Sequence, residues 1–177
     1  MKKILISVIF VFVAVVMAFG QQKREFRGAW IQCVNGQFLG MPTETMKKTL
    51  AYQLDELQKD GANAIIFQVR PECDALYESP YEPWSRFLTG TQGKAPQPYW
   101  DPLAWMVEQC HNRGMELHAW INPYRAKTKN TTVLASNHIA VTAPQRVFAY
   151  DGQFIVNPGM AEIIYARLLE ISCVGMI

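Results

Sequence analysis

Between residues 24 and 157 the chain alternates short apolar, strand-like runs with segments of helical periodicity. This alternation is typical of α/β domains, in which parallel strands are joined by helices. There is neither an internal repeat nor a low-complexity linker, so we expect a single domain. Strands are predicted over 26–34, 63–70, 115–122 and 153–156.

Two helices are predicted between the first three strands. The first begins at Thr43, whose hydroxyl is expected to cap the opening turn, and carries an apolar stripe that includes Leu50 and Leu54. The second begins at Asp101 and Pro102, because aspartate caps free amides and proline fits the first helical position. A further helix is predicted over 161–169. The long segments 71–100 and 123–151 lack a sustained period, and the first, which is rich in aromatic residues, is predicted to be an ordered functional loop.

The first 20 residues differ from the rest of the chain. Lys2 and Lys3 precede an almost wholly apolar stretch, and small residues lie just before Gln21. This order is typical of an export signal, so we expect a signal peptide over 1–20, a domain over 24–177, and a periplasmic, outer-surface or secreted protein. The alternative is an uncleaved anchor helix, which would be the protein's contact with a membrane.

The charge balance and the cysteines limit the partners. Removing Lys2 and Lys3 from the 17 basic residues leaves 15, equal to the 15 acidic residues. Nucleic-acid-binding domains normally carry a basic excess, so no nucleic-acid partner is expected. The four cysteines are too widely spaced for a zinc site, and neither a metal nor another cofactor is expected. Cys33 and Cys73 follow neighbouring strands at the same end, so export would allow a disulfide between them. Cys110 and Cys173 are expected to be small buried residues on helices.

Polar and aromatic residues gather where the predicted strands end. In parallel α/β folds ligands bind at the carboxyl ends of the strands. Two interpretations stay open, a ligand site and a buried hydrogen-bond network that only closes the fold. Because amide and guanidinium donors occur here beside aromatic rings, on which sugars stack, a glycan is the partner that fits best. The residues predicted to bind it are Gln68, Arg70, Trp84, His118, Trp120, Asn122, Arg125 and Asn157.

Carboxylates that could hydrolyse a glycosidic bond are few. Such hydrolysis needs a pair, one acting as an acid and the other as a base or nucleophile. Glu72, Asp74 and Glu78 follow the second strand, and Asp74 is the catalytic candidate. Its alternative role is a structural ion pair with Arg70. The other histidines, His111 and His138, are expected on the surface.

Several blocks of sequence resemble the bacterial glycosyl hydrolase-like 10 family. They are RGAW at 27–30, IIFQVRP at 65–71, SPYEPWS at 79–85, LTGTQG at 88–93, YWDPL at 99–103, RGMELHAWINPYR at 113–125 and NPG at 157–159. The resemblance implies a TIM-type (β/α) barrel that acts on glycans, with bacterial cell-wall polymer one substrate class. Full-length members continue into a strand similar to Asp-Gly-(Ile or Val)-His-Phe-Asp-Asp-Tyr-Phe, whose aspartates are the natural catalytic candidates, and nothing in this chain matches it.

We therefore expect a partial barrel of about three strand–helix units that stops before the barrel closes, since a complete barrel needs about 250 residues. Such a piece is expected to be poorly stable or inactive. The leading hypothesis is the N-terminal portion of an exported glycoside hydrolase that lacks its catalytic pair. The alternatives are a non-catalytic carbohydrate-binding protein and a truncated gene product without function.

Overall fold

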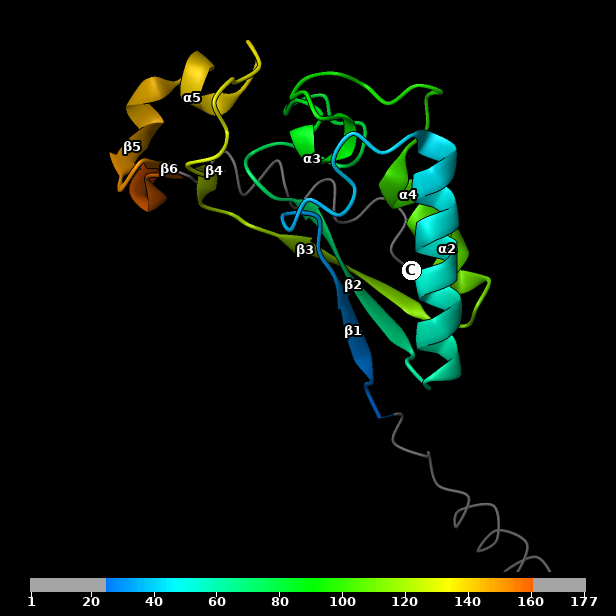
Figure 1. Ribbon diagram of the computed structural model, residues 1–177. Coiled ribbons are helices and arrows are strands. Elements are labelled where there is room, and N and C mark those ends of the chain that lie inside the picture. Colours follow the sequence, from blue (N-terminus) through cyan, green and yellow to red (C-terminus); the bar gives the residue numbers. More distant parts are fainter. Residues whose placement is uncertain (1–24, 161–177) are drawn as a thin grey trace, which may run out of the picture.

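Two sheets form the frame of the protein, whose computed structural model describes residues 25–160 (Figure 1). The signal peptide predicted over 1–20, the helix predicted over 161–169 and Cys173 lie outside the described residues. A parallel sheet has the order β1 (Gly28–Ile31), β2 (Ala64–Arg70), β3 (Glu116–Ile121). A small antiparallel sheet has the order β4 (Arg125–Lys127), β6 (Gln153–Val156), β5 (Val147–Tyr150). The predicted α/β class and its first three strands are confirmed, and the described residues form no closed barrel.

Helices α2 (Thr43–Lys59) and α4 (Pro102–His111) lie on one side of the parallel sheet (Figure 1). Asp101 caps α4 as predicted, because its carboxylate accepts a hydrogen bond from the Ala104 amide at 2.9 Å. The predicted cap of α2 is wrong: no side chain caps this helix, and the Thr43 hydroxyl donates to the Pro98 carbonyl at 3.1 Å. The hydroxyl therefore ties the start of α2 to the segment before α4.

The main core fills the space between these helices and the sheet. Ile65, Phe67 and Val69 of β2 are buried against apolar side chains of both helices. Alternation along the strand puts these three residues on the face that the helices cover. The helix residues buried with them are Met46, Leu50, Leu54, Met106 and Cys110.

The other face of the parallel sheet, which we call the open face, carries polar and aromatic side chains. The register aligns Trp30 with Ile66 and His118, and aligns Gln68 with Trp120. Trp30 and Trp120 meet edge to face with 5.0 Å between ring centroids, and Trp30 is 63% exposed. The alternation predicted for the third strand, with one face under helices and the other polar, is confirmed.

The long segment between β2 and α4 is ordered, as predicted. Ala75 and Trp84 form an isolated bridge, and the Ser85 side chain caps the short helix α3 (Arg86–Thr89). The segment therefore folds back on itself above the carboxyl end of β2.

The segment 123–151 has more structure than its sequence predicted. It contains β4, α5 (Ile139–Thr142), the 3-10 turn η1 (Pro144–Arg146) and β5, and a second turn, η2 (Pro158–Met160), follows β6. Asp151 and Gly152 have φ values of 46° and 73° and join β5 to β6 directly, as in the tight hairpin turns that Asp-Gly favours. The predicted strand 153–156 is thus correct, but it pairs antiparallel in the small sheet.

The described cysteines are not paired. Cys33, Cys73 and Cys110 are free and buried, so the disulfide considered between Cys33 and Cys73 is not formed. Burial raises the pKa of the Cys73 thiol to about 12 and that of Cys110 to about 11. Among the described helices, none combines the length and apolar character needed to cross a membrane.

Candidate functional site

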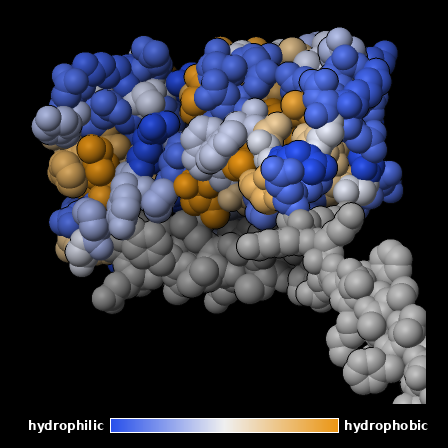
Figure 2. All heavy atoms as spheres, turned by 90° about the horizontal axis from the view of Figure 1, so that it is seen from below, coloured by the Kyte–Doolittle hydropathy of each residue, from blue (hydrophilic) through white to orange (hydrophobic). Residues whose placement is uncertain are grey.

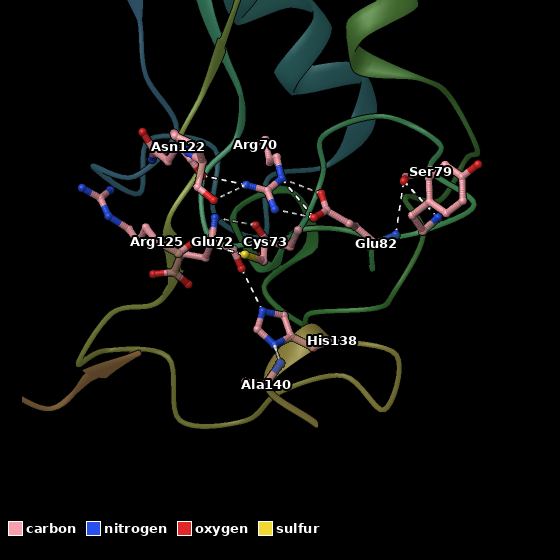
Figure 3. Close-up of polar contacts among 12 residues, drawn as sticks. Arg70, Glu72, Cys73, Ser79, Glu82, Asn122, Arg125, His138 and Ala140 are labelled. Atoms are coloured by element: carbon pink, nitrogen blue, oxygen red, sulfur yellow. Dashed lines mark hydrogen bonds and ion pairs between the residues drawn. The ribbon is translucent and has the colours of Figure 1, made fainter. Parts of the chain in front are cut away.

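Arg70 organises the carboxyl end of β2, where the loops gather. Its side chain is fully buried, and its Nε lies 2.7 Å from Oε2 of Glu82, with which the guanidinium forms an ion pair. Its Nη1 donates to the backbone carbonyl of Asn122 at 2.7 Å. In the close-up, Arg70 lies between Glu82 and Asn122 (Figure 3). Arg70 therefore joins the loop after β2 to the end of β3, and the ion pair considered between Arg70 and Asp74 is wrong.

Gln68 holds the loop after β1. Its Oε1 accepts hydrogen bonds from the backbone amides of Cys33 at 3.1 Å and Val34 at 3.3 Å. The side chain is fully buried, and its Nε2 has no hydrogen-bond partner among the described residues. A buried amide donor without a partner is costly, so this group needs an acceptor supplied from elsewhere.

Trp120 and Asn122 form the accessible part of this edge. The Trp120 indole nitrogen donates to Oδ1 of Asn122 at 3.0 Å, and Nδ2 of Asn122 donates to the Pro71 carbonyl at 3.1 Å. Both side chains are half-buried. Their mutual hydrogen bond fixes the orientation of the indole, which is held against Trp30 on the open face.

Three other predicted binding residues lie away from this edge. His118 is one alternation step before Trp120, where it is exposed and meets Phe26 edge to face. Trp84 packs in the loop after β2 against Tyr99. Asn157 is exposed after β6, and its side chain accepts from the Gly159 amide. The structure thus brings Gln68, Arg70, Trp120 and Asn122 together and leaves His118, Trp84 and Asn157 apart.

Arg125 begins β4, three residues after Asn122. Its backbone carbonyl accepts a long contact of 3.5 Å from the Cys73 thiol, whereas its guanidinium points away from Arg70 and Glu82 (Figure 3). Among residues 25–160 this guanidinium has neither an ion pair nor a hydrogen-bond partner, and the side chain is half-exposed. Arg125 is therefore a cation free to meet a ligand.

The catalytic candidate Asp74 is buried. Its Oδ1 accepts from the Glu72 amide at 3.0 Å, its Oδ2 accepts from Nε2 of Gln92 at 2.9 Å, and Ser85 also bonds to it. Burial, and after it the nearby charge of Glu72, raises the pKa of Asp74 to about 6. Gln92 in turn accepts from the Ala135 amide at 2.9 Å, so Asp74 helps to tie the loop after β2 to the segment before α5.

Glu72 is a second buried carboxylate that serves as an anchor. Its Oε1 accepts from the Thr128 amide at 3.1 Å, and its Oε2 accepts from the Thr131 hydroxyl and lies 3.4 Å from Nε of Arg86. The side chain is fully buried. Glu72 therefore fixes the chain between β4 and α5 to the parallel sheet.

His138, expected on the surface, is instead fully buried. Its Nδ1 accepts from the Ala140 amide at 3.1 Å, so its Nε2 carries the proton and donates to the Glu72 carbonyl at 2.9 Å (Figure 3). Burial lowers the pKa of this imidazole. Sequence reasoning missed both His138 and Glu82, because neither lies in a periodic element that signals burial; His111 is exposed as expected.

The described groups suit recognition better than bond cleavage. The edge offers indole faces, an oriented amide and a free guanidinium. The carboxylates of Glu72 and Asp74 instead accept hydrogen bonds from the protein and have no contact with solvent. Among residues 25–160, no three His, Cys, Asp or Glu side chains gather in a way that could hold a metal ion.

Comparisons with known proteins agree on one family. The family model described as "Glycosyl hydrolase-like 10" matches residues 25–166. Glycosyl hydrolase YngK of Bacillus subtilis (strain 168) is 42% identical over 152 residues, which cover 82% of this chain and 29% of that protein. Glycosyl hydrolase DigH of Escherichia coli (strain K12) is 32% identical over 164 residues, which cover 81% of this chain and 37% of that protein. The chain thus spans about a third of the length of these relatives, and it belongs to the glycosyl hydrolase-like 10 family.

Proposed function

We propose that this chain supplies part of the glycan-binding cleft of an exported glycoside hydrolase that acts on bacterial cell-wall polysaccharide. The proposed reaction class is supported by the family membership and by both relatives being named glycosyl hydrolases. Export is proposed from the signal-like residues 1–20. The cell-wall substrate is proposed from the resemblance to the family.

The observation that carries the proposal is the aromatic pair on the open face, in which Trp120 lies at the carboxyl edge and Trp30 one alternation step before it. Trp30 and Trp120 present flat apolar surfaces within 5.0 Å of each other, directly beside the oriented amide of Asn122. Aromatic faces with a few fixed polar groups are what small-molecule and sugar sites use to combine affinity with orientation. A sugar ring on Trp120 would come within reach of the Asn122 amide.

We further propose that the parallel sheet is the first part of a (β/α) barrel. Its two faces support this view, because α2 and α4 cover one face while the open face carries Trp30, Trp120 and the buried amide of Gln68. In TIM-type barrels, helices surround the strands and the inward face fills with side chains. Strands from outside residues 25–160 would then continue the sheet around the open face, give the Gln68 amide its missing acceptor, and leave Trp120 and Asn122 at the carboxyl rim, where barrels bind ligands.

The catalytic carboxylates are proposed to lie outside residues 25–160. A glycosidase needs two carboxyl groups that reach the scissile bond. Asp74, the candidate from the sequence, is fully buried and saturated with hydrogen bonds, so we assign it the role of positioning the loop after β2. A raised pKa alone does not make it an acid catalyst, since it has no path to a substrate.

Calorimetry with cell-wall glycan strands freed of peptide, and with soluble amino-sugar oligomers, tests the proposal. We expect the chain to bind these glycans, with Trp120→Ala weakening binding about tenfold and the exposed-aromatic control Tyr52→Ala leaving it unchanged. A chimera that joins residues 1–160 to the remaining two thirds of the Bacillus subtilis relative is expected to hydrolyse the strands. Equal binding by wild type and Trp120→Ala would reject the site.

A second candidate function is carbohydrate binding without cleavage. The burial of Glu72 and Asp74 favours it, because the described edge holds recognition groups but no accessible carboxyl pair. Turnover separates the two functions. Hydrolysis by the chimera that is lost when carboxylates of the added part are replaced supports the hydrolase, and binding without turnover by the chimera supports the binding protein.

A further inference from the structure

The small sheet has two different faces. Val147 and Val156 are paired across β5 and β6, and with Phe154 they pack against Cys73 and Ala126. This is the inner face, which closes a small apolar cluster against the rest of the protein. Strand alternation sends their neighbours to the other side.

The outer face of the small sheet consists of Arg125, Phe148, Tyr150, Gln153 and Ile155. The register aligns Phe148 with Ile155 and Arg125 across the three strands, and Tyr150 with Gln153. Phe148 is 46% exposed and Tyr150 is 67% exposed, and none of the five belongs to either apolar cluster. Seen from below, the part of the surface where the small sheet lies mixes apolar with hydrophilic residues (Figure 2).

The geometry of this face suits a chain of flat rings. Phe148 and Tyr150 are two residues apart on one strand, so their side chains lie about 7 Å apart along it. Arg125 lies two strands away from Phe148, about 10 Å across the sheet. Two adjacent aromatic surfaces flanked by an amide, Gln153, and a free guanidinium match sugar rings bearing hydroxyl and carboxylate groups.

The charge on the face limits what else could bind. Arg125 is its one cation, since Lys127 lies over the Phe154 ring on the inner side at 4.7 Å. Lys129, near the hairpin turn, is already paired with Asp151 at 2.8 Å. Anionic membranes and nucleic acids are held by clusters of several basic residues, which this face lacks. One unpaired guanidinium instead complements a single carboxylate at a time.

We propose that the outer face of the small sheet binds a carboxylate-bearing stretch of the glycan, as a subsite next to the edge formed by Trp120 and Asn122. Phe148 and Tyr150 stack against sugar rings and Arg125 pairs with a sugar carboxylate. The proposal extends the cleft along the chain, since this face begins at Arg125, three residues after Asn122. The inference rests on the proposed glycan-binding function and adds to it the site and the charge of the ligand.

Binding of two forms of one glycan tests the subsite. The probes are peptide-free cell-wall glycan strands and the same strands with their carboxylates methyl-esterified, titrated into the full chain by calorimetry. We expect esterification and Arg125→Met each to weaken binding about tenfold, and Arg125→Met to have no further effect on esterified strands. Phe148→Ala and Tyr150→Ala are expected to weaken binding of both strands several-fold.

Matched controls and contrary outcomes are available in the same chain. Lys48→Gln removes an exposed cation on α2, Tyr52→Ala removes an exposed ring from the same helix, and both should bind as wild type. If wild type, Phe148→Ala and Arg125→Met all bind the unmodified strands with the same affinity, this inference is overturned while the proposed function stands. If wild type binds neither strand, both fail. Binding to anionic phospholipid vesicles that is lost in the same variants would make the face a membrane surface and overturn the sugar subsite.

Discussion

The parallel sheet and the small antiparallel sheet are held in different ways. The parallel sheet is packed against two helices through a large apolar core that includes Ile65, Phe67 and Leu50. The small sheet has an apolar cluster of only three buried residues among those described. The segments around it are tied to the loop after β2 by the Thr128 amide, which donates to the Glu72 carboxylate, and by His138, which donates to the Glu72 carbonyl. Buried apolar side chains hold the parallel sheet, whereas hydrogen bonds to buried polar groups hold the small sheet.

This difference separates the sheet that stabilises the fold from the sheet that we propose to bind glycan. Phe148, Tyr150 and Arg125 belong to the sheet with little apolar core, so local opening there should cost less free energy than global unfolding. The small sheet can then change its position or order while the parallel sheet stays folded.

The largest effect is expected from Phe67→Ala in the main core. Phe67 is fully buried between the sheet and the helices. Removing the ring should lower the free energy of unfolding by about 4 kcal/mol. Urea denaturation followed by circular dichroism measures it, and hydrogen exchange should show faster exchange in both sheets together. Faster exchange confined to the small sheet would contradict the distinction.

A smaller and local effect is expected from Glu72→Gln. The substitution keeps the shape but removes the charge that faces Arg86 and weakens the bonds to Thr128 and Thr131. We expect the free energy of opening of this region to fall by about 2 kcal/mol. Amide hydrogen exchange should therefore be faster in β4, β5 and β6 but not in β2. The matched control is Glu56→Gln, which removes an exposed carboxylate on α2 and should change little. Equal acceleration in β2 would show that the two sheets open as one unit.

The pH dependence of stability should depend on Asp74. Its carboxyl has an ordinary pKa of 3.8, and burial raises it to about 6 in the folded protein. The folded state therefore favours the protonated carboxyl. Its contribution to the free energy of unfolding is complete below about pH 4 and is lost as the pH rises to about 6. The free energy of unfolding of Asp74→Asn, relative to that of wild type, should rise by up to about 3 kcal/mol between these two pH values. A difference between the two proteins that is constant from pH 4 to 7 would refute the assignment.

The smallest effect is expected from Lys129→Gln. Lys129 and Asp151 form an ion pair at 2.8 Å in which both side chains are more than half exposed. Exposed ion pairs contribute little to stability, so we expect the free energy of unfolding to fall by about 0.5 kcal/mol, a difference that disappears in 1 M salt. Thermal melts at low and high salt measure it. A loss as large as that of Glu72→Gln would mean that surface charges, and not the buried anchors, hold the small sheet.

The sequence predicts the regular helices and strands well, because the residues that they bury recur at the period of the helix or strand. Alternation in β3 and the stripe on α2 both correspond to residues that face the core. The hairpin of the small sheet was missed although Asp151 and Gly152 are a recognised turn pair, because the flanking strands are only four residues long.

The site was predicted only in part because sequence does not show which polar groups satisfy one another. Arg70 was expected to face a ligand, but Glu82 from the following loop neutralises it in the interior. Asp74 is the catalytic candidate from the sequence, but in the fold Gln92 and Ser85 bond to its carboxylate. These partners come from a long segment without periodicity, so only the folded chain reveals them.

Two of the three free thiols among the described residues, Cys73 and Cys110, can report on local opening in different parts of the protein. Cys73 lies in the cluster between the sheets, whereas Cys110 lies in the main core, and both are protonated and shielded at neutral pH. An alkylating reagent can therefore reach each sulfur only when its surroundings open. If the small sheet moves by itself, mass spectrometry of the two tryptic peptides will find Cys73 modified many times faster than Cys110. The ratio of the two rates will measure how independently of the main core the small sheet opens.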